Sequence, residues 1–333
     1  MTQTEIIIAL EKLGEKMASI KADDPLVVKT HISNNWFNPQ MQLKALDYWA
    51  KQLTAEKLSK WVSNYTLSES PKKIGLVMAG NIPLVGMHDL ISILVSGNIA
   101  MVKTSSDDTV LTPWVMDELI KIDRRLGERL EKVEKLNSCE ALIATGSNNT
   151  ARYFEYYFEK VPKIIRKNRN SIAVLTGNET DEELKALADD IFMYFGLGCR
   201  NVSKLMVPEN YNFNRFFEAL EPYNELVHHN KYYNNYTYHK AIFLMNIAQH
   251  LDNGFLILKE DEKLSSPLGC LFYSVYKERN NIIEYLDVNR ESIQIVIGNP
   301  KFINECVPFG QSQNPELDDY ADNVDTLRFL NQL

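Results

Sequence analysis

Apolar residues recur at helical spacing over the first 66 residues of the chain. In a helix, residues three and four apart lie on one face, so this spacing predicts helices that bury one side. We therefore expect a helical section before the first strand. The apolar positions that carry the pattern between residues 43 and 61 are Leu43, Leu46, Trp49, Ala50, Leu53, Leu58 and Trp61.

From residue 74 the pattern changes to short apolar runs that alternate with helical segments. Such runs are typical of buried strands, and their alternation with helices predicts parallel β-α-β units. The expected strands cover residues 74–79, 99–102 and 141–144, and the expected helices cover residues 84–96, about 112–126 and from about 149. This alternation predicts a doubly wound parallel sheet. Such a sheet binds ligands at the carboxyl ends of its strands.

Past Pro162 the alternation starts again, which predicts a second α/β lobe. Its expected strands cover residues 172–175, 204–207, 255–258, 271–275 and 293–297, with a helix over 180–195. The Tyr/Asn-rich segment 228–239 is expected to form a polar surface loop.

The composition is that of an ordinary globular protein that binds small molecules. With 333 residues and a hydrophobic fraction of 45%, the chain is long enough for two cores. Its net charge of −8, without long runs of one sign, argues against general attraction to nucleic acid or anionic lipid. The N-terminal apolar run is short and lacks a basic flank and a cleavage site, so we expect neither an export signal nor a membrane span.

The four cysteines are far apart in the sequence and include no C-x-x-C pair; they are Cys139, Cys199, Cys270 and Cys306. This spacing suggests neither a zinc site nor a redox dithiol, so we expect no bound metal. Unpaired cysteines fit a reducing compartment, and we expect a cytoplasmic protein.

Cys199 stands out because it follows two glycines where the helical pattern stops and a strand begins, in Phe195-Gly196-Leu197-Gly198-Cys199. Glycine permits backbone geometry that other residues resist, so Gly196 and Gly198 predict a tight turn with backbone N–H groups near the sulfur. A thiolate nucleophile needs that setting. The alternative for a single cysteine is a small buried hydrophobic residue.

Asn81 comes just after the first expected strand, in Gly80-Asn81-Ile82-Pro83. An amide NH2 at the carboxyl end of a strand can donate to negative charge that develops on a reacting oxygen, so Asn81 is a candidate oxyanion donor. A turn asparagine before proline would explain the same residue structurally.

Two further strand ends carry residues suited to a nucleotide. Lys103 and Ser105 follow the second strand, where a cation and hydroxyls can bind ribose or phosphate, although a solvated lysine explains the position equally. Thr145, Gly146 and Ser147 follow the third strand, and the helix after them would present unpaired N–H groups to an anion. Helix capping by Ser147 or Asn148 is the structural alternative. The Gly-x-Gly-x-x-Gly fingerprint is absent, so a dinucleotide would bind in another way.

In this order the motifs resemble the aldehyde dehydrogenase superfamily, and within it the acyl-CoA reductases of the LuxC-like branch. The resemblance covers most of residues 72–330. It is carried by Gly80-Asn81-Ile82-Pro83-Leu84, by Val95-Ser96-Gly97-Asn98 with Val102-Lys103-Thr104-Ser105, by Thr145-Gly146-Ser147, by the Cys199 turn, and by the ending from Pro308 through Asp325. It implies two Rossmann-like lobes after the helical section. We expect a helical and cofactor-binding domain over 1–166, a catalytic domain over 167–305, and a segment over 306–333 that packs back on the first lobe.

Two departures from the superfamily bear on the reaction. Its E-L-G-G-K glutamate, a base for water, has no counterpart in Lys167-Asn168-Arg169-Asn170-Ser171, and no E-x-F-G-P precedes Leu271, so the ribose-gripping glutamate cannot be carried over. A thioacyl enzyme without a placed base survives long enough to accept a hydride, which favours reduction of an acyl thioester over oxidation to an acid.

The resemblance therefore implies an acyl-CoA or acyl-carrier thioester substrate, reduced to a fatty aldehyde through a thioacyl intermediate on Cys199. Lys103 suits a 2′-phosphate but equally the ribose hydroxyls of NADH, so NADP is named before NAD. A homo-oligomer is consistent with the resemblance. Three alternatives stay open: an acyl-phosphate reductase, a semialdehyde dehydrogenase, and a non-catalytic nucleotide- or acyl-binding protein.

Overall fold

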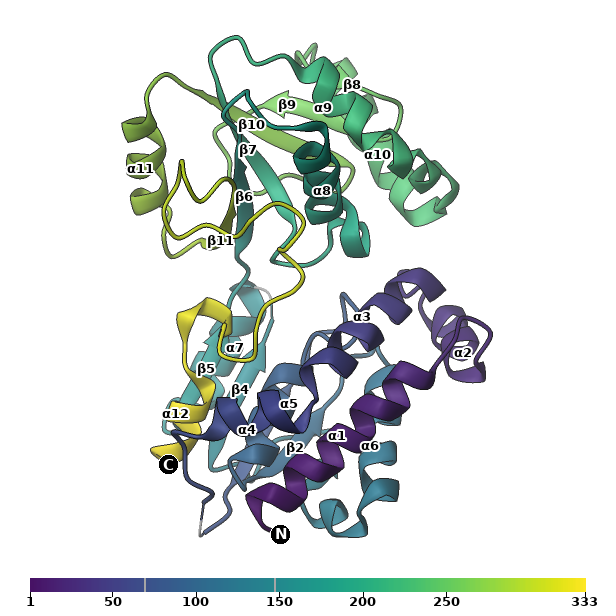
Figure 1. Ribbon diagram of the computed structural model, residues 1–333, viewed down its shortest axis with the longest axis vertical. Coiled ribbons are helices and arrows are strands. Elements are labelled where there is room, and N and C mark those ends of the chain that lie inside the picture. Colours follow the sequence, from purple (N-terminus) through teal and green to yellow (C-terminus); the bar gives the residue numbers. More distant parts are fainter. Residues whose placement is uncertain (69, 147) are drawn as a thin grey trace. The chain divides into compact units, whose positions relative to one another are not determined.

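The computed structural model describes residues 1–68, 70–146 and 148–333, which fold as two compact units (Figure 1). The first unit comprises Met1–Asn168 and Glu316–Leu333, and the second comprises Arg169–Pro315. Each unit holds one sheet, as the apolar runs predict, so the expected fold class is confirmed.

The first unit begins with the expected helical section. Its helices are α1 (Gln3–Ser19), α2 (Pro25–Ser33), α3 (Pro39–Gln52) and α4 (Ala55–Val62). In α1 a capping box between Thr2 and Glu5 fixes the start of the helix. The apolar residues of α1 that recur at helical spacing are buried, among them Leu10, Leu13 and Met17. Burial of one face against the rest of the unit holds this helix in place.

A five-stranded parallel sheet in the order β3-β2-β1-β4-β5 forms the centre of the first unit. Its strands are β1 (Lys73–Val77), β2 (Ile99–Lys103), β3 (Leu130–Lys132), β4 (Ala141–Thr145) and β5 (Lys163–Arg166). The helices between them are α5 (Met87–Val95), α6 (Leu111–Ile122), the short η1 (Arg124–Glu128) and α7 (Asn148–Tyr157). The strand order reverses between β1 and β4. Because β-α-β crossovers are right-handed, this reversal makes the sheet doubly wound.

The C-terminal residues return to the first unit from Glu316 onward. Here η4 (Ala321–Asn323) and α12 (Thr326–Asn331) pack on it, and the buried Arg166 guanidinium joins them to α5 by donating to Asp89 at 2.7 Å and to the Ala321 carbonyl at 2.7 Å. The sequence places this return at residue 306, ten residues too early. Residues 306–315 instead belong to the second unit, because backbone N–H groups of Gly310 and Ser312 donate to the carboxylate of Asp190.

A six-stranded sheet in the order β11-β6-β7-β10-β9-β8 forms the second unit, parallel except for the β8–β9 pair. Its strands are β6 (Asn170–Val174), β7 (Val202–Pro208), β8 (Leu251–Asp252), β9 (Ile257–Glu260), β10 (Cys270–Tyr276) and β11 (Ile293–Ile297). Its helices are α8 (Asp181–Phe192), η2 (Met193–Gly196), α9 (Phe213–Leu220), η3 (Glu221–His228), α10 (Asn230–Met245) and α11 (Arg279–Val288).

The predicted surface loop over residues 228–239 is wrong, because most of this segment lies in α10. His229 caps the helix by accepting the N–H of Tyr232. Tyr232 and Tyr236, four residues apart, are buried on one face, and the Tyr232 hydroxyl donates to the Phe255 carbonyl at 3.0 Å. Tyrosines that bury their rings and satisfy their hydroxyls stabilise this helix despite its polar composition.

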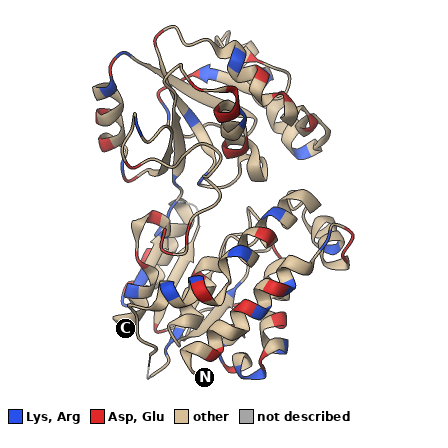
Figure 2. Cartoon of the chain, in the orientation of Figure 1, with Lys and Arg blue, Asp and Glu red and all other residues tan. Residues whose placement is uncertain are grey.

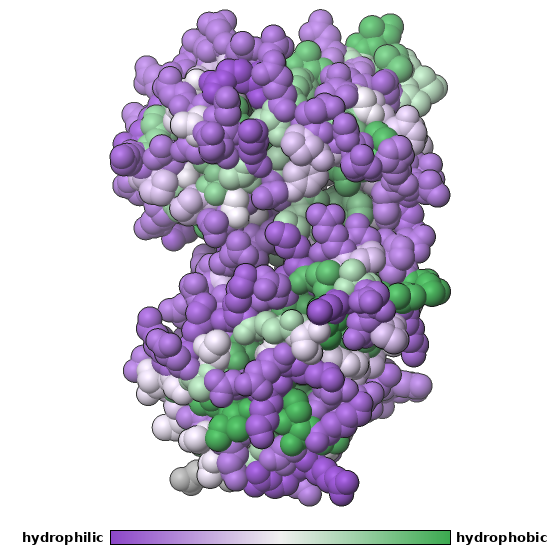
Figure 3. Space-filling model, turned by 45° about the vertical axis from the view of Figure 1, so that its right-hand side comes forward, coloured by the Kyte–Doolittle hydropathy of each residue, from purple (hydrophilic) through white to green (hydrophobic). Residues whose placement is uncertain are grey.

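Basic and acidic side chains are interspersed over both units, consistent with the absence of long charge runs in the sequence (Figure 2). The surface in Figure 3 is mostly hydrophilic, with separate hydrophobic patches. No helix among the described residues is long and apolar enough to cross a membrane. Within the same residues, no group of three or more His, Cys, Asp or Glu side chains is arranged to hold a metal ion.

His88 gives the first unit a testable dependence on pH. Its Nε2 lies 2.8 Å from the Leu317 carbonyl, its ring packs beside Trp61 and Tyr320, and burial lowers its pKa. Below about pH 6.5 the unfolded chain therefore binds a proton that the folded unit resists, so the free energy of unfolding should fall by up to about 1.4 kcal/mol per pH unit. His88→Gln, which keeps a donor for Leu317, should flatten that slope.

Tryptophan fluorescence during urea unfolding measures this slope, since all four tryptophans lie between residues 36 and 114, in the first unit. Equal slopes for the wild type and His88→Gln between pH 7 and pH 5.5 would contradict a role for the His88 proton.

Candidate functional site

The Cys199 turn begins where α8 ends and the chain reverses sharply. Tyr194, Phe195 and Gly196 have φ angles of 52°, 59° and 77°, so three consecutive residues are left-handed. A Cβ on Gly196 would also lie 3.2 Å from the Ile191 carbonyl oxygen. Left-handed tyrosine and phenylalanine are costly and persist only where their surroundings hold them. Gly196 is left-handed, as the sequence suggests, but Gly198 is not among the left-handed residues that the structure describes. The strained residues are Tyr194 and Phe195, just before the first glycine.

Hydrogen bonds fix the main chain around Cys199. The Ser171 hydroxyl, on β6, donates to the Cys199 carbonyl at 2.8 Å. The Gly198 N–H donates to Asn201 Oδ1 at 2.8 Å, and Asn201 Nδ2 donates in turn to the Met193 carbonyl at 2.8 Å. Asn201 thereby joins the end of the helical segment to the turn. Cys199 itself is exposed, so a fixed backbone presents its side chain to solvent.

The other three cysteines differ from Cys199 in their environment. Burial raises the pKa of Cys139 and Cys306, and it raises that of Cys270, which is 7% exposed, to about 12. A thiol with a raised pKa holds little thiolate at neutral pH, and thiolate is the reactive form. These three residues therefore fit structural roles, and Cys199 differs from them in being exposed.

The strand-end candidates of the first unit lie at one edge of its sheet. Strand β1 pairs with β2 on one side and β4 on the other, with Val77 beside both Lys103 and Ala144. Asn81 follows β1, Lys103 ends β2 and Thr145 ends β4, so all three sit at the carboxyl edge. Asn81 and Lys103 are exposed there, and Thr145 is half-buried. Ser147 lies outside the described residues.

Two glycines at this edge allow close approaches. A Cβ on Gly80 would lie 2.6 Å from both Cβ and Oγ of Ser105, so the loop that carries Asn81 packs directly on the loop that carries Ser105. A Cβ on Gly146 would lie 3.2 Å from the Thr150 Cβ at the start of α7. Glycine at both positions thus lets neighbouring loops pack closely at the carboxyl edge, where open α/β sheets bind nucleotides. Because these loops pack closely at the carboxyl edge, the residues that they carry fit the binding of a nicotinamide cofactor.

The structure thus brings together Asn81, Lys103, Ser105, Thr145 and Gly146 in the first unit, whereas Cys199 belongs to the second. The sequence pattern did not identify Ser171 and Asn201, which hold the turn, because neither belongs to a recognisable motif. His229, to which it assigned no role, packs its ring on Phe195 of the turn, with the ring centroids 4.3 Å apart.

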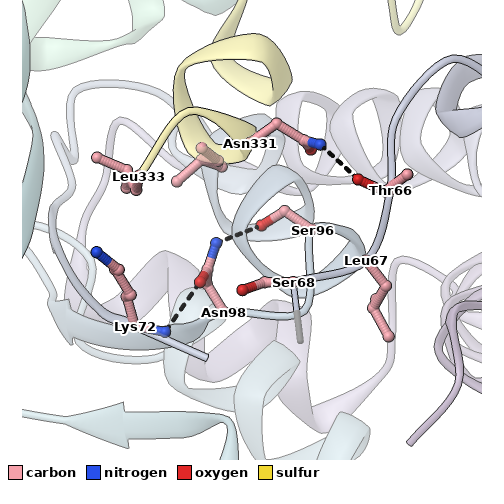
Figure 4. A pocket seen from close by; sticks show the side chains of 9 residues that line it. Thr66, Leu67, Ser68, Lys72, Ser96, Asn98, Asn331 and Leu333 are labelled. Atoms are coloured by element: carbon pink, nitrogen blue, oxygen red, sulfur yellow. Dashed lines mark hydrogen bonds between the residues drawn. The ribbon is translucent and has the colours of Figure 1, made fainter. Parts of the chain in front are cut away.

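A separate pocket of about 360 Å³ lies at the opposite edge of the first sheet (Figure 4). Lys72 precedes β1 and Asn98 precedes β2, so the pocket is at the amino ends of the strands. Its polar groups bond to one another: Asn98 accepts the Lys72 N–H at 2.9 Å, and Asn331 donates to Thr66 at 3.0 Å. Because ligands of open α/β sheets bind at the carboxyl ends, we do not place the functional site here.

Several solved structures share this fold. A putative aldehyde dehydrogenase from Burkholderia cenocepacia superposes with a TM-score of 0.64 at 11% identity, covering 90% of this chain and 74% of its own. An NADP-dependent enzyme from E. coli gives 0.66 at 12% identity, covering 95% and 79%. An NAD-dependent benzaldehyde dehydrogenase from Corynebacterium glutamicum gives 0.67 at 10% identity, covering 92% and 80%. No curated protein matches the sequence.

These superpositions show that the chain has the fold of the aldehyde dehydrogenases. The model of the family described as acyl-CoA reductase (LuxC) matches residues 41–221, more than half of the 333 residues. The chain belongs to this acyl-CoA reductase family. The match includes the Cys199 turn and the three strand ends of the first unit.

Proposed function

We propose that this protein is an NAD(P)H-dependent acyl thioester reductase that forms a fatty aldehyde through a thioacyl intermediate on Cys199. The main support is that Cys199 is exposed on a turn whose backbone is held by hydrogen bonds. In addition, this member of the acyl-CoA reductase family has no carboxylate at the position of the water-activating glutamate. In this account the first unit binds the cofactor and the second carries the nucleophile. The unpaired thiols fit the reducing cytoplasm as its place of action.

In the proposed reaction the Cys199 thiolate attacks the thioester carbonyl, and a new C–S bond forms as the carbonyl oxygen takes up negative charge. When this tetrahedral species collapses, the C–S bond to coenzyme A breaks, and coenzyme A leaves as a thiolate that takes a proton from water. NAD(P)H, when bound, supplies the hydride that reduces the acyl group to the aldehyde. Release of the aldehyde restores the Cys199 thiolate.

Two groups are proposed to stabilise the oxyanion. One is the Asn81 amide, because its exposed side chain stands in the loop after β1 at the carboxyl edge of the sheet, where open α/β sheets bind ligands. The other is a backbone N–H of the Cys199 turn. Donors fixed before the reaction stabilise developing charge without a cost of reorientation in the transition state.

Lys103, Ser105, Thr145, Gly146 and Ser147 are proposed to bind the cofactor, with NADP preferred to NAD. The Lys103 side chain is exposed at the end of β2, where an ammonium group can pair with a 2′-phosphate. We expect NADPH to support a higher kcat/KM than NADH, and Lys103→Ala to reduce this preference by about tenfold, the usual effect of losing one charged contact.

Steady-state oxidation of both cofactors, with acyl-CoAs of several chain lengths, acyl phosphates and small semialdehydes as substrates, tests this proposal. Turnover with acyl-CoAs supports it. Turnover confined to acyl phosphates or semialdehydes would assign the chain to one of those reactions instead, and cofactor binding without turnover would indicate a binding protein.

A further inference from the structure

The C-terminal strap, defined here as residues 308–314, packs against α8 in the second unit. Asp190 of α8 anchors it: Oδ2 accepts the Gly310 N–H at 2.6 Å, and Oδ1 accepts the Ser312 N–H at 3.0 Å. Asp190 is 1% exposed, and burial raises its pKa. The two backbone donors, which lie 120 and 122 residues further along the chain, offset the cost of burying this carboxyl group and tie the strap to α8.

Ser312 also connects the strap to the nucleophile turn. While its N–H donates to Asp190, its carbonyl accepts a hydrogen bond from Nε of Arg200, the residue after Cys199. Gly310 keeps the strap close to the helix, because with a φ of 79° a Cβ there would lie 3.0 Å from the Ala186 Cβ. The main chain of one strap residue therefore bridges α8 and the Cys199 turn.

We infer that Asp190 is a positioning residue for Cys199, acting through the strap. This inference rests on the proposed function of Cys199 as the nucleophile. The turn contains the left-handed residues Tyr194 and Phe195, so it needs restraint from outside. Ser171 on β6 and Asn201 just before β7 restrain its backbone, and the strap restrains the Arg200 side chain. Loss of Asp190 releases that third restraint.

The test compares Asp190→Asn with the matched control Asp189→Asn, which removes the same charge from the exposed neighbouring position of the same helix. A second variant, Gly310→Ala, displaces the strap while Asp190 stays intact. The first readout is the rate constant of Cys199 acylation by dodecanoyl-CoA in a single turnover. The second is alkylation of Cys199 by iodoacetamide, which needs no aligned carbonyl. The third is amide hydrogen exchange in peptides covering residues 193–203 and 306–314.

Asp190→Asn and Gly310→Ala are expected to slow acylation by about tenfold or more, since misplacing a reacting group by an ångström costs up to about a hundredfold. Alkylation should stay near the wild-type rate, and exchange should rise in both peptides together. Asp189→Asn should change none of the three. Should Asp190→Asn fail to fold, Gly310→Ala decides by the same criteria.

The inference would be overturned if Asp190→Asn and Gly310→Ala were acylated at the wild-type rate and hydrogen exchange rose only in the strap peptide. If the wild type itself forms no acyl adduct, the proposed function fails, and the exchange data still decide whether the strap holds the turn: a joint rise in both peptides supports the connection, and an unchanged turn peptide refutes it.

Discussion

Replacing Cys199 by serine is expected to lower the turnover of acyl thioester reduction by at least about a thousandfold. An alcohol at its ordinary pKa is a far poorer nucleophile than a thiolate, and the structure places no second exposed thiol on a comparable turn among the residues it describes. Because the Cys199 side chain is exposed and serine has nearly the same shape as cysteine, the substitution should leave stability nearly unchanged. Reduction of acyl-CoA by purified Cys199→Ser, followed through NAD(P)H absorbance, measures the loss.

Cys306→Ala is the matched control, because it removes a half-buried thiol from the same unit. Burial raises the pKa of Cys306, so this residue should contribute nothing as a nucleophile, and the variant should keep most of the wild-type turnover. If Cys199→Ser retained even a tenth of the wild-type rate, Cys199 would not be the nucleophile.

Asn81→Ala is expected to lower kcat by about a hundredfold or more, the usual loss on removal of one oxyanion donor. The effect should fall on kcat, with little change in KM, because the donor acts on charge that exists only in the transition state. Asn81→Asp replaces the NH2 by a carboxylate oxygen that repels an oxyanion, so it should be at least as impaired. Steady-state kinetics of the three proteins at saturating cofactor separate the two constants.

Asn137→Ala controls for the loss of an asparagine from the first unit. Asn137 is exposed and precedes β4, so it lies at the amino edge of the same sheet, away from the strand ends that carry Asn81 and Lys103. Wild-type kinetics are expected for it. A change in Asn81→Ala that appeared only in KM would mean that Asn81 contacts the ground-state substrate and does not stabilise the oxyanion.

The long apolar runs of the sequence predict the central strands well, because each central strand is buried on both faces. Ile74, Ala100 and Leu142 are completely buried, for example. The edge strands β3 and β5 give no comparable signal: β3 is three residues long, and only Leu130 of it is buried. The sequence pattern does not predict helix α10, for another reason. Its tyrosines and asparagines are typical of loops, and only the tertiary contacts of Tyr232 and Tyr236 show which face is buried.

The residues of the candidate site also differ in whether the local sequence marks them. The sequence alone suggests Asn81, Lys103, Thr145 and Cys199 as candidates, since a strand end or a glycine-rich turn marks each position. Ser171, 28 residues before Cys199, and Asp190, 120 residues before Gly310, act through hydrogen bonds to distant backbone groups. Periodicity and short motifs report neighbours in sequence, so such contacts emerge only once the chain is folded.

The central claim is that an acyl group passes from a thioester to Cys199. The most direct test is intact mass and peptide mapping after the protein is mixed with short- and long-chain acyl-CoAs in the absence of any nicotinamide cofactor. We predict one acyl adduct, located on Cys199, that disappears when NADPH is added. The absence of an adduct from every thioester would contradict the claim.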